Sequence, residues 1–308
     1  MSKIWKKSGL IYNVDKRIKW GSNTIMTPNP VLIDEEIIRV YCGIRDDSGR
    51  SRIGYLDLRA DNPSHILKIS ERPVLDLGSP GMFDDNGVIL GDVIKVGNVW
   101  YMYYVGFQIP MNAKFIACSG LAVSSDDGES FKRVQQTPIA DRVPNAPFGR
   151  CIHTVLYHEG KFKIWYSVIY GWEYIDGKPY PQYDIRYVES EDGIHINDEE
   201  GIHCLGVGPG EYRIGRPRVI INEDNQYEMR YTFDTLKKEY ISGLALSNDG
   251  IHWIRKDEEA GLTKSESGWD SEMACYPVQI ETKYGVYLFY AGNGMGAGGF
   301  GYAVLKQD

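Results

Sequence analysis

The chain repeats one hydrophobic pattern five times, at intervals of about 62 residues. Each copy has an alternating apolar strand, a short polar turn and a second strand rich in Tyr and Trp. The five turns fall at Asp34–Glu36, Gly97–Asn98, Glu159–Gly160, Asn222–Asn225 and Thr282–Gly285. Period-two alternation around turns rich in Gly, Asn and Asp predicts five β-hairpins.

A third apolar strand follows each hairpin, at Ile53–Leu58, Gly120–Ser124, Ile185–Ser190, Gly243–Ser247 and Gly299–Val304. Three of these strands run into a recurring turn, written Ser125-x-Asp127-Gly128, Ser190-x-Asp192-Gly193 and Ser247-x-Asp249-Gly250. Its Ser and Asp side chains can bond the turn backbone, and Gly supplies positive φ. An apolar residue three positions after each Gly then begins a fourth strand. The sequence therefore predicts an all-β fold, a five-bladed β-propeller with four antiparallel strands per blade.

The ends of the chain complete this picture. The fifth unit has only three strands, and the segment Ile4–Tyr12 is left over before the first unit. We expect this N-terminal strand to close the ring, so that residues 1–308 form a single propeller domain. No helix longer than ten residues is expected. Two stretches, Gln136–Gly149 and Gly171–Gln182, are predicted as irregular loops over the functional face.

Composition narrows the class of protein. The 308 residues carry 34 Lys and Arg against 42 Asp and Glu, a net charge of −8, which argues against a nucleic-acid binder. No apolar run approaches the ~20 residues of a membrane helix, and the N-terminus does not resemble a signal peptide. The five cysteines are dispersed, without a CxxC pair, and are expected as free buried thiols of a cytoplasmic protein. We expect a monomer or small homo-oligomer without membrane partners.

Motifs for cofactors are weak. The Gly-rich segment Gly292–Gly299 joins a strand to a strand, whereas a dinucleotide or phosphate loop would open a helix. The six histidines show no i, i+4 pair, so no zinc site is expected. We expect no cofactor, although oxygen ligands in the channel leave calcium as an alternative.

The predicted topology gathers polar residues at one mouth of the central channel. In each blade the first strand lines the channel and the second strand returns to the face where the first began. The polar residues at those positions include three catalytic candidates, Asp84, Asp85 and Glu272. The binding candidates are Arg45, Asp46, Asn86, Arg150, His153, Arg213, Arg216, Arg218 and Asn293. Carboxylates and arginines at this density shift one another's pKa values and mark a candidate site, although each residue alone also fits a turn or a salt bridge.

Three segments carry a resemblance to a known group. Phe83–Gly106, Gly215–Thr232 and Tyr290–Val304 resemble the five-bladed propeller glycosidase superfamily, which contains glycoside hydrolase families 43, 32, 62 and 68, with the family 130 phosphorylases nearby. The resemblance implies a pair of catalytic carboxylates. The second-blade acid of these families is matched by Asp84 or Asp85, and the late-blade Glu by Glu272 or Glu211.

The chain departs from the families in two respects. Where families 43 and 32 have a first-blade Asp, this sequence has Thr27-Pro28-Asn29-Pro30. The surplus of arginines is similar to the phosphorylases, in which cationic side chains hold a phosphate. Arg suits such a group because its planar fork binds phosphate or carboxylate through two hydrogen bonds.

The first hypothesis is a carbohydrate-active enzyme, hydrolase-like or phosphorylase-like, for a sugar with an anionic group, such as a sugar phosphate or nucleotide-linked sugar. Asp85 would act as base or nucleophile and Glu272 as acid, while Arg150, His153, Arg216 and Arg218 orient the anion. Trp172, Tyr174 and Tyr180 would stack on a sugar ring. The alternatives are a lyase, isomerase or transferase of cell-surface glycan synthesis, and a non-catalytic sugar-binding propeller.

Overall fold

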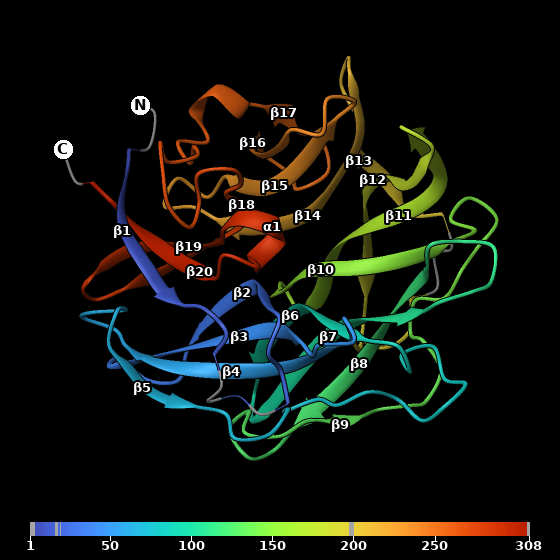
Figure 1. Cartoon of the computed structure of the whole chain (residues 1–308). Coiled ribbons are helices and arrows are strands. Elements are labelled where there is room, and N and C mark those ends of the chain that lie inside the picture. Colours follow the sequence, from blue (N-terminus) through green and yellow to red (C-terminus); the bar gives the residue numbers. More distant parts are fainter. Residues whose placement is uncertain (1–3, 16–17, 19, 197–199, 307–308) are drawn as a thin grey trace.

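A computed structural model describes residues 4–15, 18, 20–196 and 200–306, and these residues form five four-stranded antiparallel sheets around one axis (Figure 1). The inner strands, nearest the axis, are β2 (Thr24–Leu32), β6 (Val88–Val96), β10 (Gly149–His158), β14 (Glu211–Ile221) and β18 (Cys275–Thr282). The second strands are β3 (Ile37–Arg45), β7 (Val99–Gln108), β11 (Lys161–Ile175), β15 (Tyr227–Thr235) and β19 (Gly285–Ala291). The third strands are β4 (Ser51–Arg59), β8 (Ile116–Ser124), β12 (Lys178–Ser190), β16 (Tyr240–Ser247) and β20 (Phe300–Leu305). The predicted five-bladed propeller is confirmed.

The outer strands are short in four blades: β5 (Ile66–Ile69), β9 (Lys132–Arg133), β13 (Ile202–Leu205) and β17 (Ile254–Arg255). In the fifth blade the outer strand is β1 (Trp5–Tyr12), which pairs antiparallel with β20 from Trp5–Leu305 to Tyr12–Phe300. Figure 1 shows this blue strand beside the red one. The ring is therefore closed by the N-terminal strand, as predicted.

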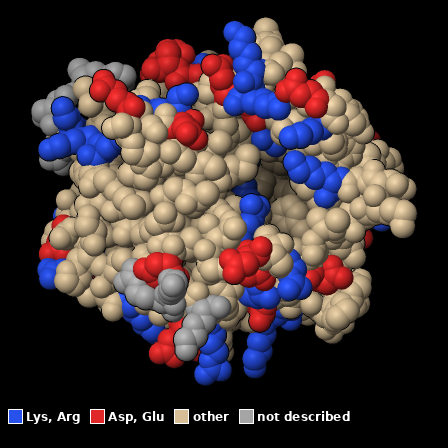
Figure 2. Space-filling view, viewed as in Figure 1, with Lys and Arg blue, Asp and Glu red and all other residues tan. Residues whose placement is uncertain are grey.

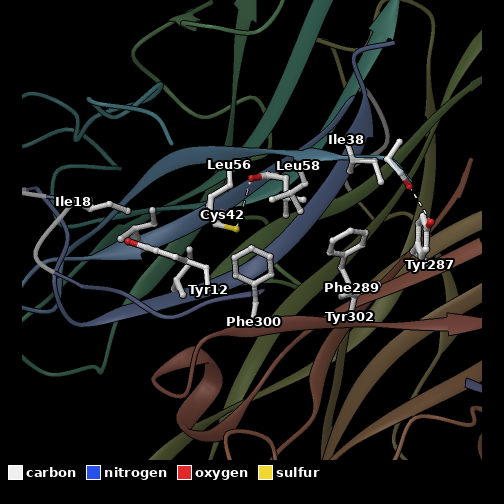
Figure 3. Close-up of a cluster of buried hydrophobic side chains, with 14 residues drawn as sticks. Tyr12, Ile18, Ile38, Cys42, Leu56, Leu58, Tyr287, Phe289, Phe300 and Tyr302 are labelled. Carbon is white, nitrogen blue, oxygen red and sulfur yellow. Dashed lines mark hydrogen bonds between the residues drawn. The ribbon is translucent and has the colours of Figure 1, made fainter. Parts of the chain in front are cut away.

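Apolar side chains fill the spaces between neighbouring blades. Figure 3 shows the space between blades one and five, where Cys42 and Leu58 of blade one face Phe289 and Phe300 of blade five. All four side chains are fully buried. Full burial of each large apolar side chain contributes about 1.5–3 kcal/mol, so this interface stabilises the ring closure.

The recurring Ser-x-Asp-Gly turn connects neighbouring blades. In blades three and four, the hydroxyls of Ser190 and Ser247 accept the backbone N–H of the turn Gly, at 3.0 and 2.9 Å. In blade two the serine is Ser124 rather than the expected Ser125, because this turn is one residue longer. The carbonyl of each turn Gly then accepts a hydrogen bond from an aromatic side chain of the preceding blade. These pairs are Tyr41–Gly128, Tyr103–Gly193 and Trp165–Gly250, at 2.8, 3.0 and 2.8 Å.

One predicted loop is instead a β-ribbon. Gly171–Gln182 continues β11 and β12, with Gly171 paired to Gln182 and Ile175 paired to Lys178. Its tip is Asp176–Gly177, both at positive φ, which is the geometry of a two-residue hairpin turn. Pro179 and Pro181 disfavour a central strand, but this part of β12 is an edge with no outer neighbour, where a missing N–H is tolerated. The stretch 136–149 is mainly irregular, as expected.

Helices are short in the described residues: a 3₁₀ turn, Asp257–Glu259, and α1 (Asn293–Gly296). No described helix has the length and apolar character needed to span a membrane. All five cysteines are free, as expected; four of them are buried, and Cys204 is partly exposed.

Candidate functional site

A β-bulge interrupts each of the five inner strands at the same level of the channel. The strand register shifts between Met26 and Asn29, Leu90 and Asp92, Ile152 and Thr154, Gly215 and Arg218, and Cys275 and Val278. In three strands the bulge is a residue at positive φ followed by Pro, namely Thr27, Arg216 and Tyr276. In the other two it is Gly91 or His153. Because a bulge redirects the side chain, this ring of bulges sets what faces the channel mouth.

Buried polar groups close the channel at this level. Arg216 of blade four donates to the Leu90 carbonyl of blade two at 2.8 Å. Arg218 reaches the same strand, donating to the Gly91 carbonyl at 2.6 Å and to Asp92 at 2.9 Å. Asn29 also donates to Asp92, at 3.0 Å. Arg218 therefore ties opposite sides of the channel together through a buried ion pair.

An inner cavity of about 90 Å³ lies on the mouth side of this network. Its walls are Val105, Phe107, Phe115, Ala117, Cys151, His153, Ser167, Ile169, Tyr183 and Arg216. His153 Nδ1 and Ser167 Oγ are buried and have no hydrogen-bond partner in the structure as described. Burial and the charges of Arg216 and Arg218 lower the pKa of His153 well below its usual value. The imidazole is therefore neutral at pH 7.

A middle hollow of about 240 Å³ adjoins the inner cavity, and Phe107 and Phe115 line both. Arg45, Asn86 and Lys114 also line it. Burial lowers the pKa of Arg45, and the nearby Arg216 charge adds to this effect. Within the described residues, neither Arg45 nor Arg216 forms an ion pair with a carboxylate. Two neighbouring guanidinium groups without a counter-charge are a site suited to an anion. Figure 2 shows a hollow in this view, with Lys and Arg atoms inside it and along its rim.

An outer groove of about 510 Å³ continues from the middle hollow, and Lys114 lines both. Trp172, Tyr174 and Tyr180 lie together in this groove, and their stacking role stays a prediction. Trp172 packs edge-on against Phe115 and Phe148, each at 5.5 Å between ring centroids.

The candidate carboxylates lie outside these three hollows. Asp84 is buried inside blade two, where it accepts hydrogen bonds from Arg133 at 2.7 Å and Tyr104 at 3.1 Å. Asp85 is partly buried and accepts the backbone N–H of Gly81 at 2.8 Å. Glu272 is exposed. None of the three lines the inner cavity, the middle hollow or the outer groove, so their catalytic roles stay predictions.

Two further candidate arginines, Arg150 and Arg213, also make internal bonds. Arg150 donates to the Asp141 carbonyl at 2.6 Å. Arg213 pairs with Asp234 at 2.7 Å, and its guanidinium lies 5.1 Å from the centre of the Tyr240 ring. Arg213 is therefore already neutralised by a carboxylate.

The remaining polar candidates organise loops. Although burial raises the pKa of Asp46, hydrogen bonds from Ser48 and Arg52 lower it to about 2. The Asn293 side chain accepts the backbone N–H of Glu272 at 2.7 Å. Glu211, the alternative late-blade acid, pairs with Arg255. No group of three or more His, Cys, Asp or Glu side chains in the described part of the chain is arranged to hold a metal ion.

Sequence reasoning did not select several residues that line the site, namely Phe107, Lys114, Phe115, Ser167 and Tyr183. One feature of the sequence does indicate the ring of bulges. Three inner strands carry an X-Pro pair at the same position, and these pairs mark the ring of bulges.

Solved structures place this fold among glycosidase propellers. A glycoside hydrolase aligns with a TM-score of 0.73 and 16% identity, over 100% of this chain and 93% of that chain. A structure described under the family 130 mannoside phosphorylases and β-1,2-mannoside hydrolases aligns at 0.71 and 16%, over 99% and 94%. A thermostable family-43 glycoside hydrolase aligns at 0.68 and 16%, over 96% of each chain. The expected resemblance to this superfamily is confirmed for the fold.

Sequence relatives define the family more narrowly. Two curated proteins of Mycobacterium tuberculosis are each 30% identical over 303 residues, covering 98% of this chain and 99% of theirs. They are the uncharacterized proteins MT1551 of strain CDC 1551 and Rv1502 of strain H37Rv. The chain belongs to the same family as these proteins. No family model matches it.

Proposed function

We propose that the protein is a carbohydrate-active enzyme for a sugar that carries a phosphate or carboxylate group. The observation that carries this proposal is the pair of arginines at the channel mouth, Arg45 and Arg216, which have no carboxylate partner in the described chain and border connected hollows. The likeness in fold to glycoside hydrolases and phosphorylases supports a sugar as the rest of the substrate.

In this proposal the anion lies between the two guanidinium groups, and the sugar extends toward His153 and Ser167. His153 acts as the proton acceptor, because its buried imidazole is neutral and its Nδ1 has no partner within the described structure. In the free protein the charges of Arg216 and Arg218 oppose protonation of this imidazole. An anion bound at Arg216 offsets that charge, so that His153 can take a proton once the substrate is bound. Ser167 offers a hydroxyl that can orient a sugar oxygen.

A two-carboxylate mechanism is the second candidate. One observation favours it, since Asn86 lines the middle hollow and the adjacent Asp85 is partly buried at the start of the same blade. The absence of Asp and Glu from the linings of the three hollows favours His153 instead.

Thermal denaturation with added ligands tests the anion site. We expect inorganic phosphate, glucose 6-phosphate and glucuronate to raise the melting temperature more than glucose, because a ligand bound only by the folded state stabilises it. At 100 times Kd the gain is about 2.7 kcal/mol. Arg216→Asn should abolish the shift, and Asn is chosen because it tolerates the positive φ at this position. Arg45→Gln should act in the same way.

Arg59→Gln is the matched control, because Arg59 is exposed on β4 and pairs with Asp61. This variant should respond to phosphate like the unaltered protein. Stabilisation by glucose but by none of the anions would show that the substrate class is wrong.

A further inference from the structure

The three hollows form one path from the rim of the propeller to the channel. Lys114 is shared by the outer groove and the middle hollow, while Phe107 and Phe115 are shared by the middle hollow and the inner cavity. A loop of blade two and the β-ribbon of blade three form the walls of the outer groove. A ligand longer than a single sugar can therefore occupy all three in order.

The outer groove exposes aromatic and polarisable side chains. Met111 and Tyr174 are 97% and 69% exposed, the two highest values among the large apolar side chains described. Trp172 lies beside them, held by Phe115 and Phe148. Exposed apolar surface of this kind marks a binding groove, and its flat faces suit an aromatic base. Asn112 lines the same groove and offers both a donor and an acceptor to the edge of such a base.

Cations separate this platform from the inner cavity. Lys114 and Lys178 line the outer groove, and Arg45 and Lys114 line the middle hollow. No Asp or Glu lines either space. A neutral oligosaccharide carries no charge that could pair with these cations. A diphosphate that links a nucleoside to a sugar would place its negative charge beside them.

We propose that the substrate is a nucleoside diphosphate sugar, with its base in the outer groove, its diphosphate on Lys114 and Arg45, and its sugar in the inner cavity. This inference rests on the proposed function, since it extends the same anion site to a diphosphate. It adds a second recognition site, the base platform at Trp172 and Tyr174, which the arginine pair alone does not require.

Calorimetric titration with UDP, GDP, CDP, ADP and inorganic pyrophosphate tests the proposal. We expect at least one nucleoside diphosphate to bind tenfold or more tightly than pyrophosphate, because a stacked base adds affinity. Tyr174→Ala should remove most of that difference while leaving pyrophosphate affinity unchanged. Lys114→Gln should weaken both kinds of ligand.

Tyr157→Ala is the matched control, because Tyr157 is a half-exposed tyrosine of β10 outside all three hollows. It should leave every affinity unchanged. Tyr174→Ala should not impair folding, since that side chain is mostly exposed near the tip of the ribbon.

The outcomes separate this inference from the proposed function. If pyrophosphate binds as tightly as every nucleoside diphosphate, the base platform is wrong but the anion site stands. If mannotriose binds through Tyr174 and no nucleoside diphosphate gains over pyrophosphate, the groove holds sugar rings and the inference is overturned. If phosphate, pyrophosphate and all nucleotides fail to bind, both proposals fall.

Discussion

Replacing Arg218 by Met tests whether this arginine holds the channel together or binds substrate. The variant loses the 2.9 Å ion pair with Asp92 and the 2.6 Å bond to the Gly91 carbonyl. Met keeps much of the side-chain volume. Asp92 then stays buried with only neutral donors, namely the Asn29 amide and the backbone N–H groups of Val93 and Val155.

The cost follows from the burial of both partners. The side chains of Arg218 and Asp92 are 10% and 11% exposed, so water screens the lost charge poorly. Breaking a buried pair costs about 3–5 kcal/mol. Because three neutral donors still solvate Asp92, we expect the lower end, about 3 kcal/mol. Adding Asp92→Asn should cost less than the sum of the two single changes, since the stranded charge is then gone.

Urea unfolding followed by tryptophan fluorescence measures this effect. With a slope of about 3 kcal/mol per M, the midpoint should fall by about 1 M. Arg59→Met, which breaks an exposed pair, should move the midpoint little. A midpoint unchanged in Arg218→Met, or strict additivity in the double variant, would refute the pairing argument. If the Arg218→Met protein is stable but no longer binds phosphate, Arg218 is part of the binding site.

Three further predictions concern pH, ring closure and turnover. The pKa of His153 is lower in the folded protein than in the unfolded chain. Below about pH 6.5 the unfolded chain therefore binds a proton that the folded protein does not bind. The free energy of unfolding then falls by up to about 1.4 kcal/mol per pH unit. His153→Gln should flatten this slope between pH 6.5 and 5 in urea titrations, and parallel curves for the two proteins would contradict it. Deleting residues 1–12 should uncover the edge of β20 and cause aggregation visible by light scattering, whereas a monodisperse, equally stable product would argue against closure by β1. With a turned-over substrate, His153→Gln should lower kcat by about 10²–10⁴-fold and exceed the losses in Asp85→Asn and Glu272→Gln, while the reverse order would establish the carboxylate mechanism.

The blade pattern could be predicted because hairpins are local. Alternation and a polar turn within about 20 residues define each β-hairpin. The segment Ile4–Tyr12 belongs to no hairpin, so it is the strand available to complete blade five. The sequence does not predict the ribbon at 171–182, because Pro179 and Pro181 outweigh the Asp176–Gly177 turn signal. Pro disfavours a strand only where its missing N–H is needed, and that depends on the neighbouring strand.

The site was predictable only as far as the backbone determined it. Strand starts and ends placed Arg45, His153 and Arg216 near the mouth, since those positions follow from the topology. The residue with which a side chain forms a hydrogen bond or ion pair does not follow from the topology. Asp84 is neutralised by Arg133, a residue of β9, and nothing in the local sequence indicates that contact.

The pairing of β1 with β20 also has a consequence for synthesis of the protein. Trp5 pairs with Leu305, so about 300 residues are translated between the two partners. At a translation rate of about 5–20 residues per second, β1 remains without its partner strand for roughly 15–60 s. Blades one to four can assemble during this interval, whereas the nascent chain carries an unpaired strand throughout. A chaperone that binds extended apolar segments during translation should therefore increase the yield of closed rings.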